Sequence, residues 1–417
     1  MDYPINVPFN PQPSTIMHID LNSCFATVEQ QADPSLRDKP IAVAAYKSSG
    51  GCILAPSIEA KRLGIKVGMR VRDGKALCPN LIVLEPDPWK YRNVHKALNK
   101  LLLSYTDLVF PKSIDEFVLD LTGAPRYKVG MVNIATEVKS RIKQEIGDYL
   151  TVSIGIAPNR YLAKIASGLR KPDGLDTIDN TNFKNIFSKL VLHDLTGIKT
   201  QNIARLNRHE IFSVLDFYEA TPMTLQQTFH AVTGHYWYLR LRGWEIDDVA
   251  THRGSYSNSV ALGKNLTTPD ELAPVLINLV EKMAARMRAE DYGAHGVHLS
   301  LVYKNHRGFW HKGLSTADVL FATQQIYKVA YKLLLQSPYR NPVHIIAVTC
   351  FSLVKEKTQQ PYIFDYINKE ITLTKVLDSI NDKWGNFVIT SGKMLSTQQP
   401  VKDRIAFGGL EKLCDSS

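Results

Sequence analysis

The sequence predicts a multidomain α/β protein. Its 417 residues are more than one hydrophobic core normally organises, and its 44% apolar and 22% charged content is typical of a folded globular chain. Short β-rich runs alternate with helical periodicity up to about Thr181, which indicates an α/β region. The segment from about Asn182 to Thr251 shows mostly helical periodicity, and strands return from Gly254 to about Glu356.

The first region is expected to begin with a strand, Thr15–Leu21. Ser23 is a suitable N-cap for a following helix, Cys24–Gln31. The later elements of this region are predicted from their apolar runs and from the Gly and Pro residues that mark their ends. They are strands Pro40–Ala45 and Cys52–Pro56, helices Ser57–Leu63 and Lys90–Tyr105, an apolar run Leu108–Pro111, helix Met131–Ile146, strand Thr151–Ile156 and helix Asn159–Arg170.

The last region is expected to be a sheet with helices. The same patterns predict strands Tyr256–Leu262, Val297–Tyr303 and His344–Ser352, and helices Pro269–Glu290, Ser315–Leu335 and Thr374–Lys383.

The charge of the chain indicates a polyanionic partner. With 50 basic and 40 acidic residues the formal net charge is +10. No apolar run approaches the roughly 18 residues that span a bilayer, and the first residues lack the features of a signal peptide, so nucleic acid is favoured over a membrane. The absence of a Cys-x-x-Cys pair favours a reducing cytoplasm over disulfides or structural zinc. The five cysteines are Cys24, Cys52, Cys78, Cys350 and Cys414.

Three carboxylates carry the strongest chemical signal. Asp20 ends the first strand, and Asp115 and Glu116 are adjacent in a segment that reads as a hairpin. Neighbouring acids in an apolar strand repel each other and lose hydration unless a cation compensates. Both can reach one site only where the strand bends, because adjacent strand residues face opposite ways. Such acids can hold two hard cations about 3.5–4 Å apart for phosphoryl transfer, in a nuclease, a cyclase or a polymerase.

Several segments in this order resemble the Y-family, the lesion-bypass DNA polymerases. The resemblance is carried by motifs over roughly the first 175 residues and by architecture in the remainder. The motifs are Asp20-Leu21-Asn22-Ser23-Cys24-Phe25-Ala26, Glu59-Ala60-Lys61-Arg62-Leu63-Gly64, Ser113-Ile114-Asp115-Glu116, Ser153-Ile154-Gly155-Ile156-Ala157, Leu162-Ala163-Lys164-Ile165-Ala166-Ser167 and Lys171-Pro172-Asp173-Gly174.

The resemblance implies a right-hand polymerase. Its palm, a mixed sheet plus helices, would comprise residues 1–23 and 87–182, and its small fingers residues 24–86. A helical, helix–hairpin–helix-like thumb would follow at 183–253, and an α+β little finger at 254–357. The little finger carries 12 basic and 7 acidic residues between 255 and 357, a modest excess that fits contact with a DNA backbone. Residues 358–417 would form a C-terminal tail.

The resemblance also implies the site residues. Asp20, Asp115 and Glu116 match the family's catalytic, metal-binding acids, and the backbone carbonyl of Leu21 matches its fourth ligand, for two Mg²⁺ ions. The nucleotide-binding positions are Ser23, Cys24, Phe25, Lys61 and Lys171.

Their implied roles differ. The Ser23 and Cys24 amides, at a helix start, would face phosphate oxygens, and the Phe25 ring would exclude a 2′-hydroxyl. Lys61 departs from the family's commonest Tyr-Glu-Ala-Arg form, because the sequence reads Ile58-Glu59-Ala60-Lys61. The ammonium of Lys61 is a point charge, and it stands where the family commonly has the bidentate guanidinium of an arginine.

Two further segments suggest contacts outside the active site. His193-Asp194-Leu195-Thr196-Gly197-Ile198-Lys199-Thr200 resembles a helix–hairpin–helix turn that grips DNA phosphates, although it lacks the usual second glycine. In the tail, Gln360-Pro361-Tyr362-Ile363-Phe364 resembles the peptide by which bacterial polymerases hold the sliding clamp. Gln360, Ile363 and Phe364 are its expected contacts. Segments typical of both the UmuC-like and the DinB-like branches are present, so the branch stays open.

The implied function is template-directed DNA synthesis that adds deoxynucleotides to a primer 3′-end and bypasses damaged template with low fidelity. The expected partners are primer–template DNA, deoxynucleoside triphosphates and a sliding clamp, with a regulatory subunit left open and no membrane. The expected location is cytoplasmic, at the bacterial nucleoid. A palm-fold nucleotidyl cyclase would explain the acids but not the Glu-Ala-Lys segment. A non-catalytic scaffold at stalled forks would explain the basic domain and tail but not three retained acids.

Overall fold

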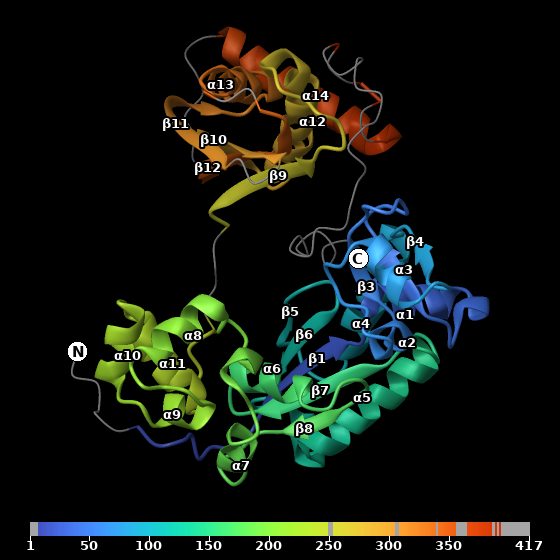
Figure 1. Ribbon diagram of the computed structural model, residues 1–417, viewed down its shortest axis with the longest axis vertical. Coiled ribbons are helices and arrows are strands. Elements are labelled where there is room, and N and C mark those ends of the chain that lie inside the picture. The colour runs from blue at the N-terminus through green and yellow to red at the C-terminus, as the bar shows by residue number, and fades with distance from the viewer. Residues whose placement is uncertain are drawn as a thin grey trace. The chain divides into compact units, whose positions relative to one another are not determined.

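The protein divides into two compact units, one ending at Val249 and the other beginning at Ala250 (Figure 1). The computed structural model describes residues 7–248, 253–304, 308–338, 341–355, 365–385, 388–389 and 392. No helix within these ranges is both long and apolar enough to span a bilayer.

A five-stranded sheet forms the centre of the first unit. Its strand order is β5-β6-β1-β7-β8, and β1 pairs antiparallel with both β6 and β7. Helix α6 contacts β1 and β7, whereas α1, α4 and α5 contribute to the larger hydrophobic core with Met17, Ile19 and Leu21 of β1. The alternate residues of β1, including His18 and Asp20, therefore face the opposite side. The elements are β1 Ile16–Leu21, β5 Val109–Pro111, β6 Glu116–Asp120, β7 Val152–Ala157, β8 Leu175–Thr177, α1 Cys24–Ala32, α4 Pro88–Leu102, α5 Met131–Glu145 and α6 Arg160–Gly168.

A smaller three-stranded sheet follows α1 in the chain. Its order is β3-β2-β4, with β2 and β4 parallel and β2 and β3 antiparallel. Its residues form a separate small core with those of the neighbouring helices. The elements are β2 Ile41–Ala44, β3 Ile53–Pro56, α2 Ile58–Arg62, α3 Val71–Leu77 and β4 Ile82–Leu84.

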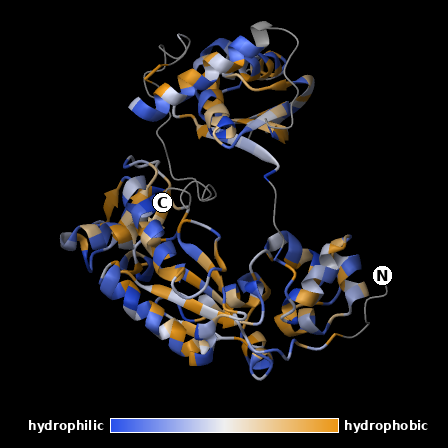
Figure 2. Cartoon of the chain, turned by 180° about the vertical axis from the view of Figure 1, so that it is seen from behind, coloured by the Kyte–Doolittle hydropathy of each residue, from blue (hydrophilic) through white to orange (hydrophobic). Residues whose placement is uncertain are grey.

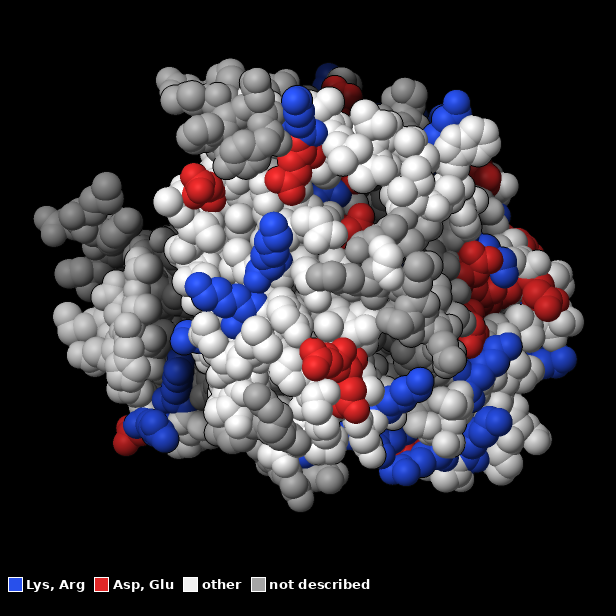
Figure 3. Space-filling view, turned by 90° about the horizontal axis from the view of Figure 1, so that it is seen from above, with Lys and Arg blue, Asp and Glu red and all other residues white. Residues whose placement is uncertain are grey.

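Helices complete the first unit. They pack on α6 through a third core, which also takes in Phe9 of the N-terminal segment, stacked on Phe183 at 4.2 Å between ring centroids. The helices are α7 Phe183–Phe187, α8 Thr200–Asn207, α9 Val214–Glu219, α10 Pro222–Phe229 and α11 Thr233–Leu241. On the face shown in Figure 3, Lys and Arg side chains form several groups with acidic side chains between them. The net positive charge is therefore not one continuous patch on that face.

The second unit is a four-stranded antiparallel sheet with helices. The strand order is β11-β10-β12-β9, and α12 and α13 supply much of its hydrophobic core. Arg288 of α12 donates to both carboxylate oxygens of Asp378 on α14, at 2.5 and 2.7 Å, so α14 is fastened to this unit. Figure 2 shows hydrophobic and hydrophilic residues alternating along the helices, as amphipathic packing requires. The elements are β9 Ser255–Ala261, α12 Pro269–Arg288, β10 Tyr292–Tyr303, β11 Phe309–Leu320, α13 Thr323–Leu335, β12 Val343–Lys355 and α14 Asp365–Trp384.

Three local expectations were wrong. Residues 315–320 belong to β11, so only the second half of the predicted helix Ser315–Leu335 is helical, as α13. Ser23 occupies the N-cap position of α1, but its φ of 50° is left-handed and its hydroxyl makes no capping bond. The helix expected at Thr374–Lys383 begins earlier, at Asp365. The strands β4 and β8 and the helix α3 had no counterpart in the sequence reading.

Candidate active site

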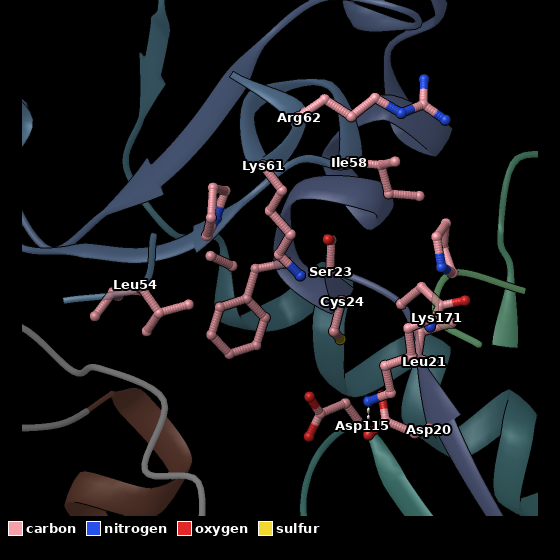
Figure 4. A pocket seen from close by; sticks show the side chains of 16 residues that line it. Asp20, Leu21, Ser23, Cys24, Leu54, Ile58, Lys61, Arg62, Asp115 and Lys171 are labelled. Carbon is pink, nitrogen blue, oxygen red and sulfur yellow. Dashed lines mark hydrogen bonds and ion pairs between the residues drawn. The ribbon is translucent and has the colours of Figure 1, made fainter. Parts of the chain in front are cut away.

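A cleft of about 470 Å³ in the first unit is lined by the end of β1, the start of α1, α2 and the segment around Lys171. All but one of the nine expected metal- and nucleotide-binding residues line it. The ninth, Glu116, lies directly opposite Asp20 in the β1–β6 register. Figure 4 shows Asp20 and Asp115 together, with Lys61 extending toward Ser23 and Cys24. The structure therefore brings together residues from four separate stretches of sequence.

The acid pair converges on Asp20 because Asp115 lies in a turn. Asp115 immediately precedes β6, and its backbone carbonyl accepts a hydrogen bond from the Leu21 amide at 2.9 Å. Glu116 is the first residue of the strand and pairs with Asp20 across the sheet. The bend that the adjacent acids require is thus the hairpin turn itself.

Each carboxylate has a different partner. Asp20 accepts from the Lys171 ammonium at 2.6 Å, Glu116 from the Lys164 ammonium at 2.6 Å, and Asp115 from the Ser113 hydroxyl at 2.5 Å. Burial raises the pKa of Asp20 and that of Asp115 above their usual range, although their hydrogen-bond partners oppose the shift. At Glu116 burial acts in the same direction, but Lys164 and other nearby cations outweigh it and lower the pKa.

The three acids suit hard divalent cations. Carboxylate oxygens are the ligands that Mg²⁺ prefers, and desolvated acids with raised pKa values gain from a nearby positive charge. His18, two residues before Asp20, joins this cluster, because single donor atoms of His18, Asp20 and Glu116 all lie within 4.8 Å of one another. Burial lowers the pKa of His18 to about 4. The residues present therefore fit a divalent metal, with a neutral imidazole beside the carboxylates.

Phe25 is a buried residue of the cleft lining, and its ring packs against a second aromatic ring. Its side chain is 2% exposed, and its ring stacks on Tyr91 of α4 at 4.4 Å between centroids. The Tyr91 hydroxyl donates to Glu29 at 2.8 Å, and the Lys90 ammonium donates to the same carboxylate at 2.7 Å. Glu29 lies four residues after Phe25, so helix α1 holds both the ring and the acceptor that fixes its support.

Ser23 and Cys24, at the start of α1, line the cleft. The Ser23 carbonyl accepts the first helical bond from the Thr27 amide at 3.0 Å, so the amides of Ser23 and Cys24 precede the intrahelical ladder. Such amides, with the helix dipole, favour an anion. The Cys24 thiol is buried, and burial raises its pKa, so it stays protonated and does not act as a nucleophile.

Two lysines, Lys61 and Lys171, also line the cleft. The segment that carries Lys171 is held by Asn22, which accepts from the Asp173 amide at 2.8 Å and donates to the Ser153 hydroxyl at 2.9 Å. Burial and the nearby Lys171 charge lower the pKa of Lys61. An incoming polyanion would relieve this repulsion between the two ammonium groups.

Sequence reasoning missed four residues around the acids. Lys164 belongs to the motif Leu162–Ser167, and Ser113 is the first residue of the motif Ser113–Glu116, but sequence reasoning assigned neither residue a role. His18 could have been found from its position two residues before Asp20, because alternate strand residues share a face. The fourth, His95, comes from α4 and had no signal in its own segment.

Comparison with known proteins gives a consistent picture. A profile of the impB/mucB/samB family matches residues 19–168, and one of that family's C-terminal domain matches residues 253–362. The chain is 31% identical over 398 residues to DNA polymerase IV of Pelotomaculum thermopropionicum, covering 93% of this chain and 97% of the relative. It is 30% identical to DNA polymerase IV 1 of Bacillus subtilis, covering 92% and 94%.

A solved structure agrees on the fold. The fold matches that of a Y-family DNA polymerase chimera of Dbh and Dpo4 with a TM-score of 0.72, at 23% identity, over 82% of this chain and 99% of that one. The fold class expected from the sequence is confirmed.

Proposed function

This chain belongs to the Y-family of DNA polymerases, and on that basis we propose that its cleft extends a DNA primer by a two-metal mechanism with Asp20, Asp115 and Glu116 as the metal-binding acids. The chain is a DNA-directed DNA polymerase of the translesion type. The observation that carries the proposal is that Asp20, in β1, and Asp115, in the turn before β6, line a cleft edged by lysines, with Glu116 directly opposite Asp20 in the β1–β6 register.

The proposed domain assignment follows the sequence. Residues 1–23 and 87–182 form the palm, 24–86 the fingers, 183–253 the thumb, 254–357 the little finger and 358–417 the tail. Support comes from the separate small core of the three-stranded sheet and from the division of the chain near residue 250.

The acids would hold two divalent cations, with the Leu21 carbonyl as a further ligand. Bound there, Mg²⁺ supplies positive charge beside the primer hydroxyl and the triphosphate. Glu116, whose pKa is lowered, stays ionised without a metal, while the hydrogen bond from Ser113 orients the Asp115 carboxylate. Lys171 and Lys164 neutralise Asp20 and Glu116 until the cations bind.

The remaining cleft residues would bind the nucleotide. The Ser23 and Cys24 amides and the Lys61 and Lys171 ammonium groups would contact the triphosphate oxygens, and the support is that all four residues line the cleft. Phe25, whose ring stacks on that of Tyr91, would lie under the sugar and exclude a 2′-hydroxyl.

We also propose the partners. Primer–template DNA and deoxynucleoside triphosphates follow from the polymerase reaction, at the bacterial nucleoid. Gln360, Ile363 and Phe364 fall outside the residues that the structure describes, and their binding to a sliding clamp rests on the sequence match alone. A regulatory subunit has no specific support among the described contacts.

The test is Mg²⁺-dependent extension of a primer across an abasic site by wild type and by Asp115→Ala. We expect wild type to extend and Asp115→Ala to lose extension while binding primer–template DNA normally. Asp120→Ala, at the other end of β6, is the matched control and should remain active.

The outcomes separate the alternatives. Extension by Asp115→Ala would remove the site assignment. Nucleotide turnover without a primer would indicate a cyclase, and DNA binding by wild type without extension would indicate a scaffold.

A further inference from the structure

His95 is a buried histidine behind the acid-bearing turn. It lies on α4, is 1% exposed, and its Nδ1 is 3.0 Å from the backbone carbonyl oxygen of Ile114. Its ring also stacks on Phe117, with 4.7 Å between centroids and 24° between planes. His95 therefore contacts the residue just before the Asp115–Glu116 pair and the residue just after it.

The chemistry of these contacts fixes the protonation of the ring. A carbonyl oxygen only accepts, so Nδ1 must carry a proton and donate it. Nε2 is buried and has no hydrogen-bond partner among the residues that the structure describes. A charged imidazole there would bury an unsatisfied N–H and an uncompensated charge, so the ring is the neutral Nδ1–H tautomer.

The turn at residues 113–115 (the acid turn) is also held by the pairing of β6 with β1 and by the burial of Ile114 in the larger hydrophobic core. The Leu21 amide binds the Asp115 carbonyl at 2.9 Å, and the Lys112 and Ser113 amides bind the Glu116 carbonyl at 2.8 and 3.3 Å. These bonds fix the turn to β1 and to itself. Among the contacts described here, the His95 hydrogen bond is the one that fixes the Ile114 carbonyl to α4. Because that carbonyl belongs to the planar Ile114–Asp115 peptide, its direction fixes the plane that ends at the Asp115 Cα and so constrains where the Asp115 side chain lies.

We propose that His95 is a positioning residue that orients the Asp115–Glu116 pair for cation binding. It acts through the Ile114 carbonyl and the Phe117 ring and does not touch substrate. The inference rests on the proposed metal-binding role of the acids and adds a determinant of metal affinity on a different helix. Groups that hold metal ligands from behind typically change metal affinity or activity by about 10- to 100-fold when removed.

The test compares His95→Leu with His95→Asn. Leucine fills the space but has no donor, whereas the asparagine amide nitrogen can take the place of Nδ1. Mn²⁺ is titrated into each protein without DNA or nucleotide, and free Mn²⁺ is followed by electron paramagnetic resonance. Mg²⁺ half-saturation and kcat are then measured in primer extension. His235→Leu, at a buried histidine of α11, is the matched control.

We expect His95→Leu to lose about 10- to 100-fold in Mn²⁺ affinity, with kcat also reduced. His95→Asn should recover most of that loss, and His235→Leu should bind Mn²⁺ as wild type does. A merely structural role would lower thermal stability without this difference in metal affinity.

Two results would overturn the proposal. One is a folded His95→Leu protein that binds Mn²⁺ like wild type, and the other is a His95→Asn protein that loses as much affinity as His95→Leu. If His95→Leu does not fold, His95→Gln replaces it, because its longer side chain moves the amide away from the Nδ1 position; equal affinities of the Asn and Gln variants would then refute the proposal. Failure of the proposed function would show separately, as wild type without Mg²⁺-dependent extension.

Discussion

Gly155 of β7 lies directly against the backbone of α6. Replacing it with alanine should destabilise the first unit. A Cβ there would lie 2.0 Å from the Ala163 carbonyl oxygen and 2.2 Å from the Ser167 nitrogen. Real Cβ contacts are not shorter than about 3.0 Å, so the strand and the helix would have to separate by about 1 Å. Both obstructing atoms belong to the backbone, so no side-chain rotation can relieve the overlap.

The size of the effect follows from this displacement. Overpacking a core costs about 1–3 kcal/mol when side chains can adjust, and we expect about 3 kcal/mol here because they cannot. With a urea dependence of about 3 kcal/mol/M, the unfolding midpoint of the first unit should fall by about 1 M. Extension should weaken as well, since Lys164 on α6 would move away from Glu116, which it contacts at 2.6 Å.

The assay is urea unfolding followed by circular dichroism, with primer extension measured on the same preparations. Gly168→Ala is the matched control, because Gly168 ends the same helix and a Cβ there meets no atom within 4 Å. That variant should unfold at the wild-type midpoint or slightly above it, since alanine favours the helix. An unchanged midpoint for Gly155→Ala would refute the reasoning, because it would mean that β7 and α6 separate without cost.

Three further predictions concern the site and the tail. Phe25→Ala should lower the preference for deoxynucleotides over ribonucleotides by about 10-fold or more in single-nucleotide incorporation; unchanged selectivity would make Phe25 a core residue only. Gln360→Ala combined with Phe364→Ala should lose stimulation by a sliding clamp and keep basal extension, and equal stimulation would leave the segment a linker. Because burial raises the pKa of Asp115, the metal-free folded state binds protons more readily than the unfolded state there. Wild type should therefore gain free energy of unfolding relative to Asp115→Asn as the pH falls through that raised pKa toward the ordinary pKa of an aspartate. A difference between the two proteins that stays constant with pH in urea unfolding would contradict the shift.

The positions of Asp20, Asp115 and Glu116, the proposed metal-binding acids, could be anticipated from the sequence because they depend on local rules. A strand end and a hairpin turn each place a carboxylate at a sheet edge, and the adjacent pair required a bend where the structure has one. The same rules located β1, α5 and α12 to within two residues of their observed bounds.

The remaining features depend on contacts between distant segments. Nothing near His95 or Lys164 in the sequence shows that α4 and α6 meet the acid turn. The strand β11 is an edge strand whose residues are mostly exposed, and its last residues, 315–320, run directly into the segment that becomes α13. Ser23 has the right residue type for a cap, but its backbone is left-handed at the start of α1 and its hydroxyl makes no capping bond.

The attachment of α14 changes how a partner would be tethered. Residues 356–364 join the end of β12 to the start of α14, and the ion pair between Arg288 and Asp378 fastens α14 to the same unit. A protein that binds Gln360–Phe364 would therefore bind between two elements, β12 and α14, that both belong to the second unit. A force applied there would reach that unit through a sheet strand and through a helix, so a partner that slides along DNA would move the unit without relying on the C-terminus.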